Sequence, residues 1–354
     1  MRIAQIAPLY EAVPPKLYGG TERVVSFLTE ELVAMGHDVT LFASGDSVTN
    51  AKLIPVWPQA LRLDPTIRDS LAPHMLLMEE VYRLADEFDI LHFHNDYFPA
   101  SLFSRQPVPF VTTLHGRLDL PELKRVYAGL PEQNLVSISD SQRLPLPEGN
   151  FIGTVHHGLP SSLLLPQPVP HDYVAFLGRI CPEKRPDRAI RIAAGAGEVL
   201  RLAAKVDRVD QDYFTTQIAP MLNERATLIG EIGDAEKPAF LSGAKALLMP
   251  IDWPEPFGLV MIEAMACGTP VIGFNRGAVP EVIEEGLTGF IVEDEIGAVA
   301  AVNRLPLLSR TRVRQRFEER FTSRRMAQQY VDVYQALIRA QKRSRFKVID
   351  SSGS

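Results

Sequence analysis

Two glutamates, Glu255 and Glu263, lie in a stretch whose other residues are typical of a phosphate-binding turn. The apolar run 246–249 leads into a proline-rich loop that carries Glu255, and Gly258 then precedes a helical pattern that contains Glu263. A helix N-terminus that follows such a loop offers free backbone N–H groups to a phosphate. Carboxylates on either side of it could accept hydrogen bonds from sugar hydroxyls, so this stretch predicts a site for a phosphorylated sugar.

The elements that position these carboxylates can be predicted from the flanking residues. Residues 245–249 and 270–274 are short apolar runs of the kind that form buried strands. Gly268 is expected to end the intervening helix in a left-handed conformation, and Pro270 prevents the helix from continuing. For a single glutamate, a solvated acid or a partner of an arginine is the better explanation, so the prediction depends on the whole stretch.

Length and composition limit the classes of protein to consider. A chain of 354 residues with 46% hydrophobic and 23% charged residues predicts two globular domains. The net charge of −6 argues against a nucleic-acid partner, and two cysteines exclude both a disulfide framework and a four-thiolate zinc site. Neither a signal peptide nor an apolar run long enough to span a membrane is recognisable, so a cytoplasmic protein is expected.

The first half predicts an α/β domain in which apolar strands end in polar residues or glycines. After the first strand comes a long loop at residues 9–20, and a helix is expected at 22–35 with Thr21 as its N-cap. No G-x-G-x-x-G occurs in this loop, which argues against a dinucleotide site. Residues 48–76 are expected to be irregular. The expected strands are residues 2–8, 37–43, 88–93, 110–114, 135–138 and 151–155.

The second half predicts another doubly wound domain after a proline-rich linker at residues 159–170. A long amphipathic basic helix is expected at 322–341, where it could dock on the acidic first domain or remain a solvated tail. The predicted parts are thus an N-terminal domain at 1–165, a C-terminal domain at 166–321 and a terminal helix at 322–343. The expected strands are residues 173–177, 199–204, 226–229, 245–249, 270–274 and 289–292.

Several motifs, taken in their order along the chain, resemble those of glycosyltransferase family 4, which contains retaining enzymes of the GT-B fold. The resemblance extends over nearly the whole chain, and the first half is similar to small bacterial members that glycosylate small molecules. It implies an α/β fold of two Rossmann-like domains facing across a cleft, with the C-terminal helix crossing back to the first domain. The motifs are Gly19-Gly20-Thr21-Glu22, His115-Gly116, Gly178-Arg179, Glu183-Lys184, Glu255-Pro256-Phe257-Gly258-Leu259, Glu263, Gly268-Thr269-Pro270-Val271 and Gly277 with Pro280-Glu281.

The resemblance implies catalytic roles for His115, Arg179, Lys184 and Glu255. The two cations would neutralise the departing nucleoside diphosphate, the arginine as a fork and the lysine as a point charge. Glu255 would hold hydroxyls of the transferred sugar at C3 and C4, and His115 would contact the sugar near the reacting carbon. Donor-binding roles fall to Gly19 and Gly20 on the phosphate side, Glu231 beside the base, Glu263 on the ribose, and Phe257, Gly258, Leu259 and Val260 at the helix N-terminus.

Some residues depart from the family pattern or suggest other chemistry. Arg185-Pro186 follows Lys184 where the family usually has a glycine, and His157 stands where it usually has an asparagine. The nearby histidines invite a zinc interpretation, but His94, His156 and His157 lie on different strand ends without acidic partners at ligand spacing. Asp210-Gln211-Asp212 is formally a D-x-D metal motif, yet it begins a helical pattern and is better explained as a helix cap.

The resemblance implies a metal-independent, retaining hexosyltransferase that moves glucose from UDP-glucose, as a co-substrate, to a small acceptor. A lipid or polysaccharide acceptor and a catalytically silent nucleotide-sugar binder are the alternatives, and the acidic first domain argues against contact with an anionic lipid surface. A periplasmic ligand-binding protein would need an export signal, and a GT-B phosphorylase would need a pyridoxal-phosphate lysine. The sequence predicts neither the acceptor nor the oligomeric state.

Overall fold

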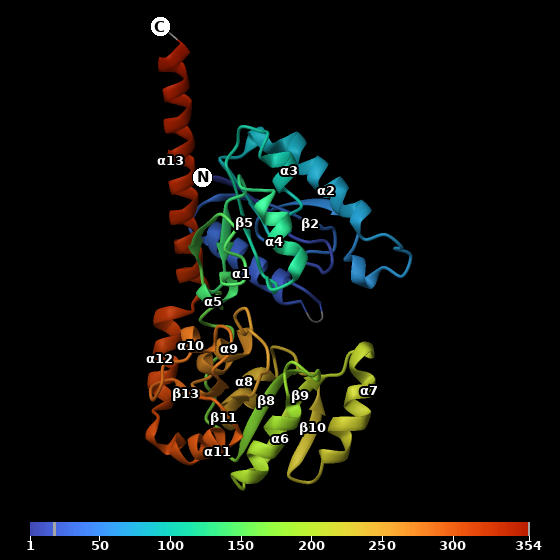
Figure 1. The fold of residues 1–354 in the computed structure, drawn as a ribbon, viewed down its shortest axis with the longest axis vertical. Helices are drawn as coiled ribbons and strands as arrows, with labels where there is room; N and C mark the ends of the chain where they lie inside the picture. Colours follow the sequence, from blue (N-terminus) through green and yellow to red (C-terminus); the bar gives the residue numbers. More distant parts are fainter. Residues whose placement is uncertain (17–18, 353–354) are drawn as a thin grey trace. The chain divides into compact units, whose positions relative to one another are not determined.

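The computed structural model describes residues 1–16 and 19–352, with side chains up to residue 343. The chain divides into two α/β units, shown in Figure 1. Unit 1 contains Met1–Gly158 together with Ser323–Ser354, and unit 2 contains Leu159–Thr322. Where the chain enters and leaves unit 2, Leu159 N–H donates to the carbonyl of Phe321 at 2.9 Å. Each unit is built on a parallel sheet, which confirms the predicted fold class.

The sheet of unit 1 has seven parallel strands in the order β3-β2-β1-β4-β5-β6-β7. Such a sheet is buried on both faces, which explains why its strands are nearly continuous apolar runs in the sequence. The strands are β1 (Arg2–Ile6), β2 (Asp38–Ser44), β3 (Lys52–Trp57), β4 (Ile90–Phe93), β5 (Phe110–Thr113), β6 (Leu135–Ser137) and β7 (Phe151–Thr154).

Helices cover both faces of this sheet. Leu77 and Val81 of α2 pack on one face, against Ile6 and Phe93, whereas Val25 of α1 packs on the other. The last helix, α13, returns to unit 1 and packs beside α1. The helices are α1 (Gly20–Ala34), α2 (Leu71–Leu84), α3 (Ala100–Phe103), α4 (Pro121–Ala128), α5 (Asp140–Arg143) and α13 (Ser323–Ser352).

Unit 2 has a parallel sheet of six strands in the order β10-β9-β8-β11-β12-β13. The order reverses between β8 and β11, which is where open α/β sheets bind their ligands. The strands are β8 (Tyr173–Arg179), β9 (Leu200–Lys205), β10 (Ala226–Gly230), β11 (Ala244–Met249), β12 (Val271–Phe274) and β13 (Gly289–Val292). The helices are α6 (Pro186–Gly195), α7 (Gln211–Tyr213), α8 (Lys237–Ser242), α9 (Leu259–Ala266), α10 (Val279–Val282), α11 (Glu295–Arg304) and α12 (Arg310–Arg320).

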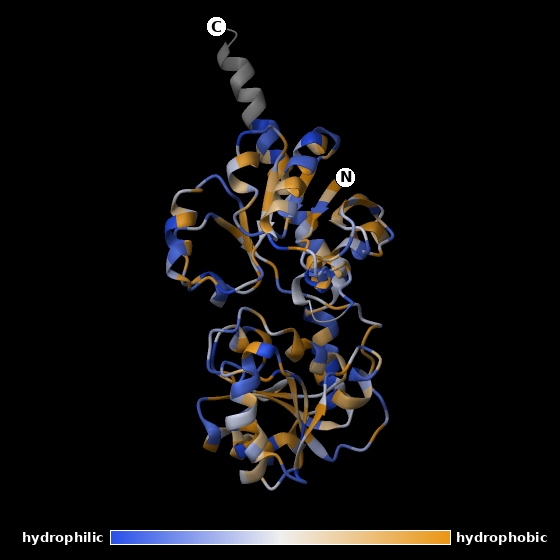
Figure 2. Ribbon diagram, turned by 90° about the vertical axis from the view of Figure 1, so that its right-hand side faces the viewer, coloured by the Kyte–Doolittle hydropathy of each residue, from blue (hydrophilic) through white to orange (hydrophobic). Residues whose placement is uncertain are grey.

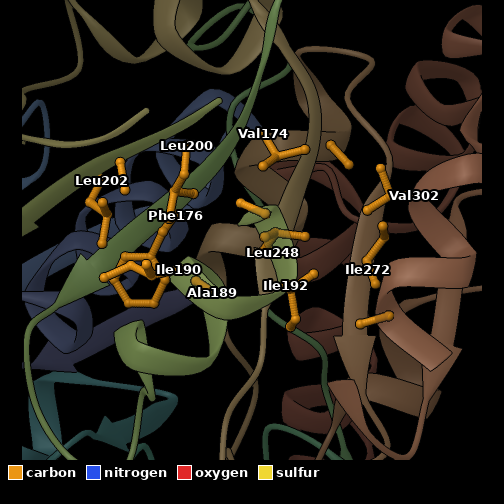
Figure 3. Packing of buried hydrophobic residues seen from close by; sticks show 14 of the residues in the cluster. Val174, Phe176, Ala189, Ile190, Ile192, Leu200, Leu202, Leu248, Ile272 and Val302 are labelled. Carbon is orange, nitrogen blue, oxygen red and sulfur yellow. The ribbon is translucent and has the colours of Figure 1, made fainter. Parts of the chain in front are cut away.

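The core of unit 2 lies between its sheet and the helices α6 and α11. Figure 3 shows side chains of β8, β9, β11 and β12 pointing into one cluster with those of α6 and α11. On the other side α9 packs against both α8 and α12, so the unit has three layers. In Figure 2 the strands are coloured mainly as hydrophobic and the surrounding helices are mixed, as expected for sheets covered by amphipathic helices.

The remaining helical elements of the described chain are single turns of π-helix or 3₁₀-helix. One π-helical turn, η4 (Phe214–Ile218), follows α7 directly. The 3₁₀ turns are η1 (Leu61–Leu63), η2 (Ala85–Glu87), η3 (Arg208–Asp210), η5 (Ala219–Met221) and η6 (Leu305–Leu307). Within the part of the chain that the structure describes, no helix is both long and apolar enough to cross a membrane.

Two local predictions were wrong. The region 48–76, expected to be irregular, contains the edge strand β3, which tolerates Pro55 because an edge strand pairs on one side only. Thr21 is not the N-cap of α1, since that helix begins at Gly20 and Gly19 occupies the cap position in an extended conformation. Because glycine has no side chain, the first N–H groups of α1 receive no capping hydrogen bond from the residue at the N-cap position.

Candidate active site

The N-terminus of α9 lies at the carboxyl end of β11, as the sequence predicted. Its N-cap is Gly258, whose φ of 81° is in the left-handed region that favours glycine. A Cβ at this position would come within 2.8 Å of Met249 Cε and 2.9 Å of Met261 Cε. With no side chain at the cap, the first-turn N–H groups of Leu259 and Val260 face outward and can bind an anionic oxygen.

A second loop holds the residues before this helix in place. Gly277, with φ 56°, lies so close to the first loop that a Cβ would be 2.3 Å from the amide nitrogen of Glu255 and 2.4 Å from its carbonyl oxygen. The N–H of Ala278 donates to that same carbonyl at 2.9 Å. Glycine at position 277 therefore allows a backbone-to-backbone contact that fixes the position of Glu255.

The Glu255 carboxylate is buried and forms an ion pair with Lys184, which comes from the turn after β8. Trp253 Nε1 donates to Glu255 Oε2 at 3.0 Å, and Lys184 Nζ lies 5.2 Å from the centre of the Trp253 ring. The three side chains thus form one cluster at the carboxyl edge of the sheet. The predicted residues Lys184 and Glu255 are brought together, whereas Trp253 was not predicted.

Glu263 is buried inside α9, and its Oε1 accepts from Lys237 Nζ at 2.7 Å. Lys237 is the first residue of α8 and lies 3.4 Å from Asp234 as well. Lys237 was not predicted from the sequence, because nothing in the local pattern distinguishes it from a solvated residue at a helix start. Only the packing of α8 on α9 shows that it neutralises Glu263.

Arg179, at the end of β8, is paired within unit 2. Its Nη1 lies 3.4 Å from Asp207 Oδ2 and 3.9 Å from Asp210 Oδ2. Asp210 occupies the N-cap position of α7, as predicted, but its side chain makes no capping hydrogen bond and faces Arg179 instead. The formal D-x-D motif therefore supplies an acidic neighbour to a cation.

The departure from the family pattern at Arg185-Pro186 has a local explanation. Arg185 is the N-cap of α6 and adopts a left-handed conformation with φ 52°, and Pro186 occupies the first helical turn as expected. The guanidinium donates to Asp187 at 2.9 Å and to Asp252 at 3.1 Å. Arg185 is therefore bound to carboxylates on both sides.

The other predicted donor-binding residues of unit 2 differ in exposure. Glu231 follows Gly230, whose φ is 88°, and lies in an exposed loop. Phe257 is buried, and its ring packs against Phe321 with centroids 6.1 Å apart. Its side chain is therefore part of the core, next to the helix terminus that Gly258 begins.

The predicted residues of unit 1 lie at the carboxyl ends of its strands. His115 follows β5, its Nε2 lies 2.8 Å from His94 Nδ1, and its ring stacks on His157 with centroids 5.2 Å apart. Burial lowers the pKa of His115 to about 3 and keeps the pKa values of His94 and His157 well below the usual range, so all three rings are neutral at pH 7. Across the residues the structure describes, no group of three or more potential ligands could hold a metal ion.

Gly19 and Gly20 lie at the start of α1 beside two buried acids. A Cβ on Gly19 would be 2.8 Å from Pro15 Cβ and 3.2 Å from Glu22 Oε2. Burial raises the pKa of Glu22 to about 7, and the neighbouring Glu11 adds to this effect. Gly19 thus permits close packing of the loop around a carboxyl group that is partly protonated near neutral pH.

Comparison with known proteins agrees with this geometry. The family "Glycosyltransferase Family 4" matches residues 18–140, and "Glycosyl transferases group 1" matches residues 166–323. The chain belongs to the glycosyltransferases of the family 4 type. This glycosyltransferase is 26% identical to the phosphatidyl-myo-inositol mannosyltransferase of Mycolicibacterium smegmatis, over 85% of this chain and 84% of the relative. It is 24% identical to the N-acetyl-alpha-D-glucosaminyl L-malate synthase of Bacillus anthracis, over 92% and 96%.

Solved structures share the fold of this glycosyltransferase. AviGT4, a glycosyltransferase involved in avilamycin A biosynthesis, aligns with a TM-score of 0.73 and 22% identity over 95% of this chain and 97% of that one. Sucrose-phosphate synthase from Thermosynechococcus elongatus aligns with a TM-score of 0.78 and 20% identity over 96% and 99%. Anabaena HepE, solved with UDP and glucose, aligns with a TM-score of 0.73 and 19% identity over 95% and 100%.

Proposed function

We propose that this glycosyltransferase transfers a hexose, with retention of configuration, from a nucleoside diphosphate sugar to a small hydroxyl-bearing acceptor. The observation that carries the proposal is the cluster at the carboxyl edge of the unit 2 sheet. There the N-terminus of α9, which has no side-chain cap at Gly258, lies beside the pairs Lys184–Glu255 and Lys237–Glu263. A diphosphate is bound by cations and N–H donors, and the hydroxyls of the sugar and of the ribose are bound by carboxylates. This edge of the sheet supplies the cations, the N–H donors and the carboxylates.

Binding of the donor would exchange the partners of the cations. In the free protein Lys184 is paired with Glu255, and Arg179 with Asp207. A diphosphate carries more negative charge than a carboxylate, so it competes for Lys184 and Arg179. Glu255 then becomes available to accept hydrogen bonds from sugar hydroxyls, while Glu263 accepts from the ribose.

The chemistry requires the bond between C1 of the sugar and the diphosphate oxygen to break, and its electron pair leaves with the diphosphate. The sugar passes through an oxocarbenium-like state, which the acceptor oxygen attacks on the same face. Because the acceptor attacks directly on that face, no carboxylate nucleophile is needed, and the acceptor proton goes to the departing phosphate oxygen. Lys184, Arg179 and the N–H groups of Leu259 and Val260 stabilise the charge that grows on the diphosphate.

The donor we favour is UDP-glucose, and the acceptor a small soluble molecule. HepE, which shares the fold, is described in complex with UDP-glucose, and this supports UDP-glucose as the first donor to test. A lipid acceptor is the alternative, because one relative is a phosphatidyl-myo-inositol mannosyltransferase.

The test is a screen of nucleoside diphosphate sugars by diphosphate release, followed by mass spectrometry of the product formed from candidate acceptors. Glu263→Ala and Lys184→Ala should each abolish turnover while the circular dichroism spectrum stays that of the wild type. Lys245→Ala, whose ion pair with Glu198 lies elsewhere in unit 2, is the matched control and should keep turnover. Near-normal turnover in either site variant would refute the site, and release of no diphosphate from any donor would favour a silent binding protein.

A further inference from the structure

A row of polar side chains crosses one face of the unit 1 sheet. Gln5 of β1, His92 of β4 and Thr113 of β5 are completely buried in strands that are mainly apolar. Gln5 and His92 are paired in the register of their strands and therefore point to the same face. Buried polar groups are costly unless they are hydrogen-bonded, so the partners of this row define its role.

Two tyrosines of α13 meet the row. Gln5 Nε2 donates to the Tyr334 hydroxyl at 3.0 Å, and that hydroxyl lies 2.6 Å from His92 Nδ1. His92 Nε2 lies 2.8 Å from Thr113 Oγ1, which is 2.9 Å from the Tyr330 hydroxyl. Because its amide nitrogen faces Tyr334, the amide oxygen of Gln5 faces the other way.

The amide oxygen of Gln5 determines the protonation pattern of two histidines. Gln5 Oε1 lies 2.9 Å from His94 Nε2 and can only accept, so His94 Nε2 carries the proton. A neutral imidazole has one N–H, and burial keeps His94 and His115 neutral, so His94 Nδ1 is an acceptor. His115 Nε2–H therefore donates to His94 Nδ1 at 2.8 Å.

This leaves His115 Nδ1 with a lone pair. The atom is buried and has no hydrogen-bond partner among the side chains that the structure describes. The ring cannot turn freely, because it stacks on His157 and is held by His94. The acceptor nitrogen of His115 is thus the single polar group of this ring left for a ligand.

We infer that Gln5 and His94 are positioning residues that hold His115 as its Nε2–H tautomer. Nδ1 of His115 is then the acceptor for a hydrogen bond from a substrate hydroxyl. Tyr334 of α13 contributes by orienting the Gln5 amide. The inference rests on the proposed function in one respect, namely that His115 touches the substrate. It gives α13 a part in the site without any contact to the ligand. If the polar row only fastened α13 to the sheet, loss of the acceptor at position 94 would leave the His115 tautomer unchanged.

The first test is a measurement of the histidine tautomers in the full chain by ¹⁵N NMR. Wild-type His115 should show a protonated Nε2 and an unprotonated Nδ1. In His94→Leu the acceptor is lost, and His115 should populate both tautomers. In His94→Asn the amide oxygen replaces the Nδ1 acceptor, and the Nε2–H form should return. A wild-type His115 protonated on Nδ1, or an unchanged tautomer in His94→Leu, overturns the inference.

The second test follows turnover, for which Tyr330→Phe is the matched control. Tyr330 is as buried as Tyr334 and lies on the same helix, but its hydroxyl contacts Thr113, at the end of the polar row that lies beyond His92 and is furthest from His115. His94→Leu should lower kcat about two- to tenfold, the equivalent of one hydrogen bond, with little change in KM. His94→Asn should recover most of this loss, and Tyr330→Phe should show none. Equal losses in Tyr330→Phe and His94→Leu would mean that the network is purely structural and would overturn the inference.

The two proposals can fail separately. Normal turnover in His115→Ala would refute the proposed contact of His115 with the substrate, whatever the tautomer is. A lost turnover in His115→Ala, together with an unchanged tautomer in His94→Leu, would keep the proposed function and refute the positioning role.

Discussion

Replacing Lys237 with methionine should destabilise unit 2. The Lys237 ammonium lies 2.7 Å from Glu263 Oε1, and the two side chains are only 14% and 4% exposed. Methionine keeps most of the aliphatic stem but removes the charge, so the Glu263 carboxylate loses its ammonium partner in a place that water hardly reaches. The loss is therefore electrostatic rather than a loss of packing.

The expected magnitude follows from burial. Removing one partner of a buried ion pair costs about 3–5 kcal/mol, and the residual exposure of Lys237 places it near the lower end, at about 3 kcal/mol. For a unit of this size each kcal/mol lowers Tm by about 2–4 °C, so the unit 2 transition should fall by about 6–12 °C. Lys245→Met is the control: its ion pair with Glu198 is also 2.7 Å long, but the side chains are 36% and 19% exposed. That change should cost less than about 1 kcal/mol.

Differential scanning calorimetry of the full chain gives the required comparison, because the two units can unfold in separate transitions. The double variant Lys237→Met with Glu263→Gln should recover part of the lost stability, since a neutral amide is less costly to bury than a carboxylate. Equal shifts in Lys237→Met and Lys245→Met would refute the reasoning, because burial would then make no difference to the value of the pair.

Two further predictions concern other positions. Gly277→Ala should lower turnover about 100-fold with little change in circular dichroism. The added Cβ would displace the backbone of Glu255, and a misplacement of about 1 Å of a substrate-binding group is enough for such a loss. Turnover near that of the wild type would contradict the role given to this contact. Glu22 has a pKa of about 7 when folded and an ordinary value of 4.5, so the unfolded chain loses this proton first and the stability of unit 1 should fall as the pH rises from 4.5 to 7. Glu22→Gln should remove this loss of about 3 kcal/mol, which urea unfolding at pH 5 and pH 8 would detect, and an unchanged pH dependence would contradict the assignment.

Most strands of both units could be predicted because buried parallel strands are short apolar runs between glycines, prolines and polar residues. β3 was missed, because Pro55 interrupts a half-buried edge strand that lacks such a run. Thr21 has the chemistry of an N-cap, yet Gly19 took that place because the loop before α1 packs too closely for a side chain. At both positions, tertiary packing determined the local structure more strongly than the conformational preference of the residue itself.

The candidate site was predictable where its residues are near one another in sequence. Glu255, Gly258 and Glu263 belong to one strand-loop-helix unit, and their relative positions follow from its geometry. Lys237 reaches Glu263 from another helix, so no local pattern could show the pair. Gln5 left a signal that was not used: it is a single polar residue in the middle of a buried apolar strand.

The chain passes from unit 1 to unit 2 at Leu159 and back to unit 1 after Phe321, and this order has a consequence for biosynthesis. Unit 1 begins first on the ribosome but is finished last, because α13 follows the whole of unit 2 in the chain. Unit 2 is one uninterrupted segment and can fold as soon as it has emerged. Until Tyr330 and Tyr334 are made, the polar row around His92 has no cover, so unit 1 completes its core only after translation of the last helix.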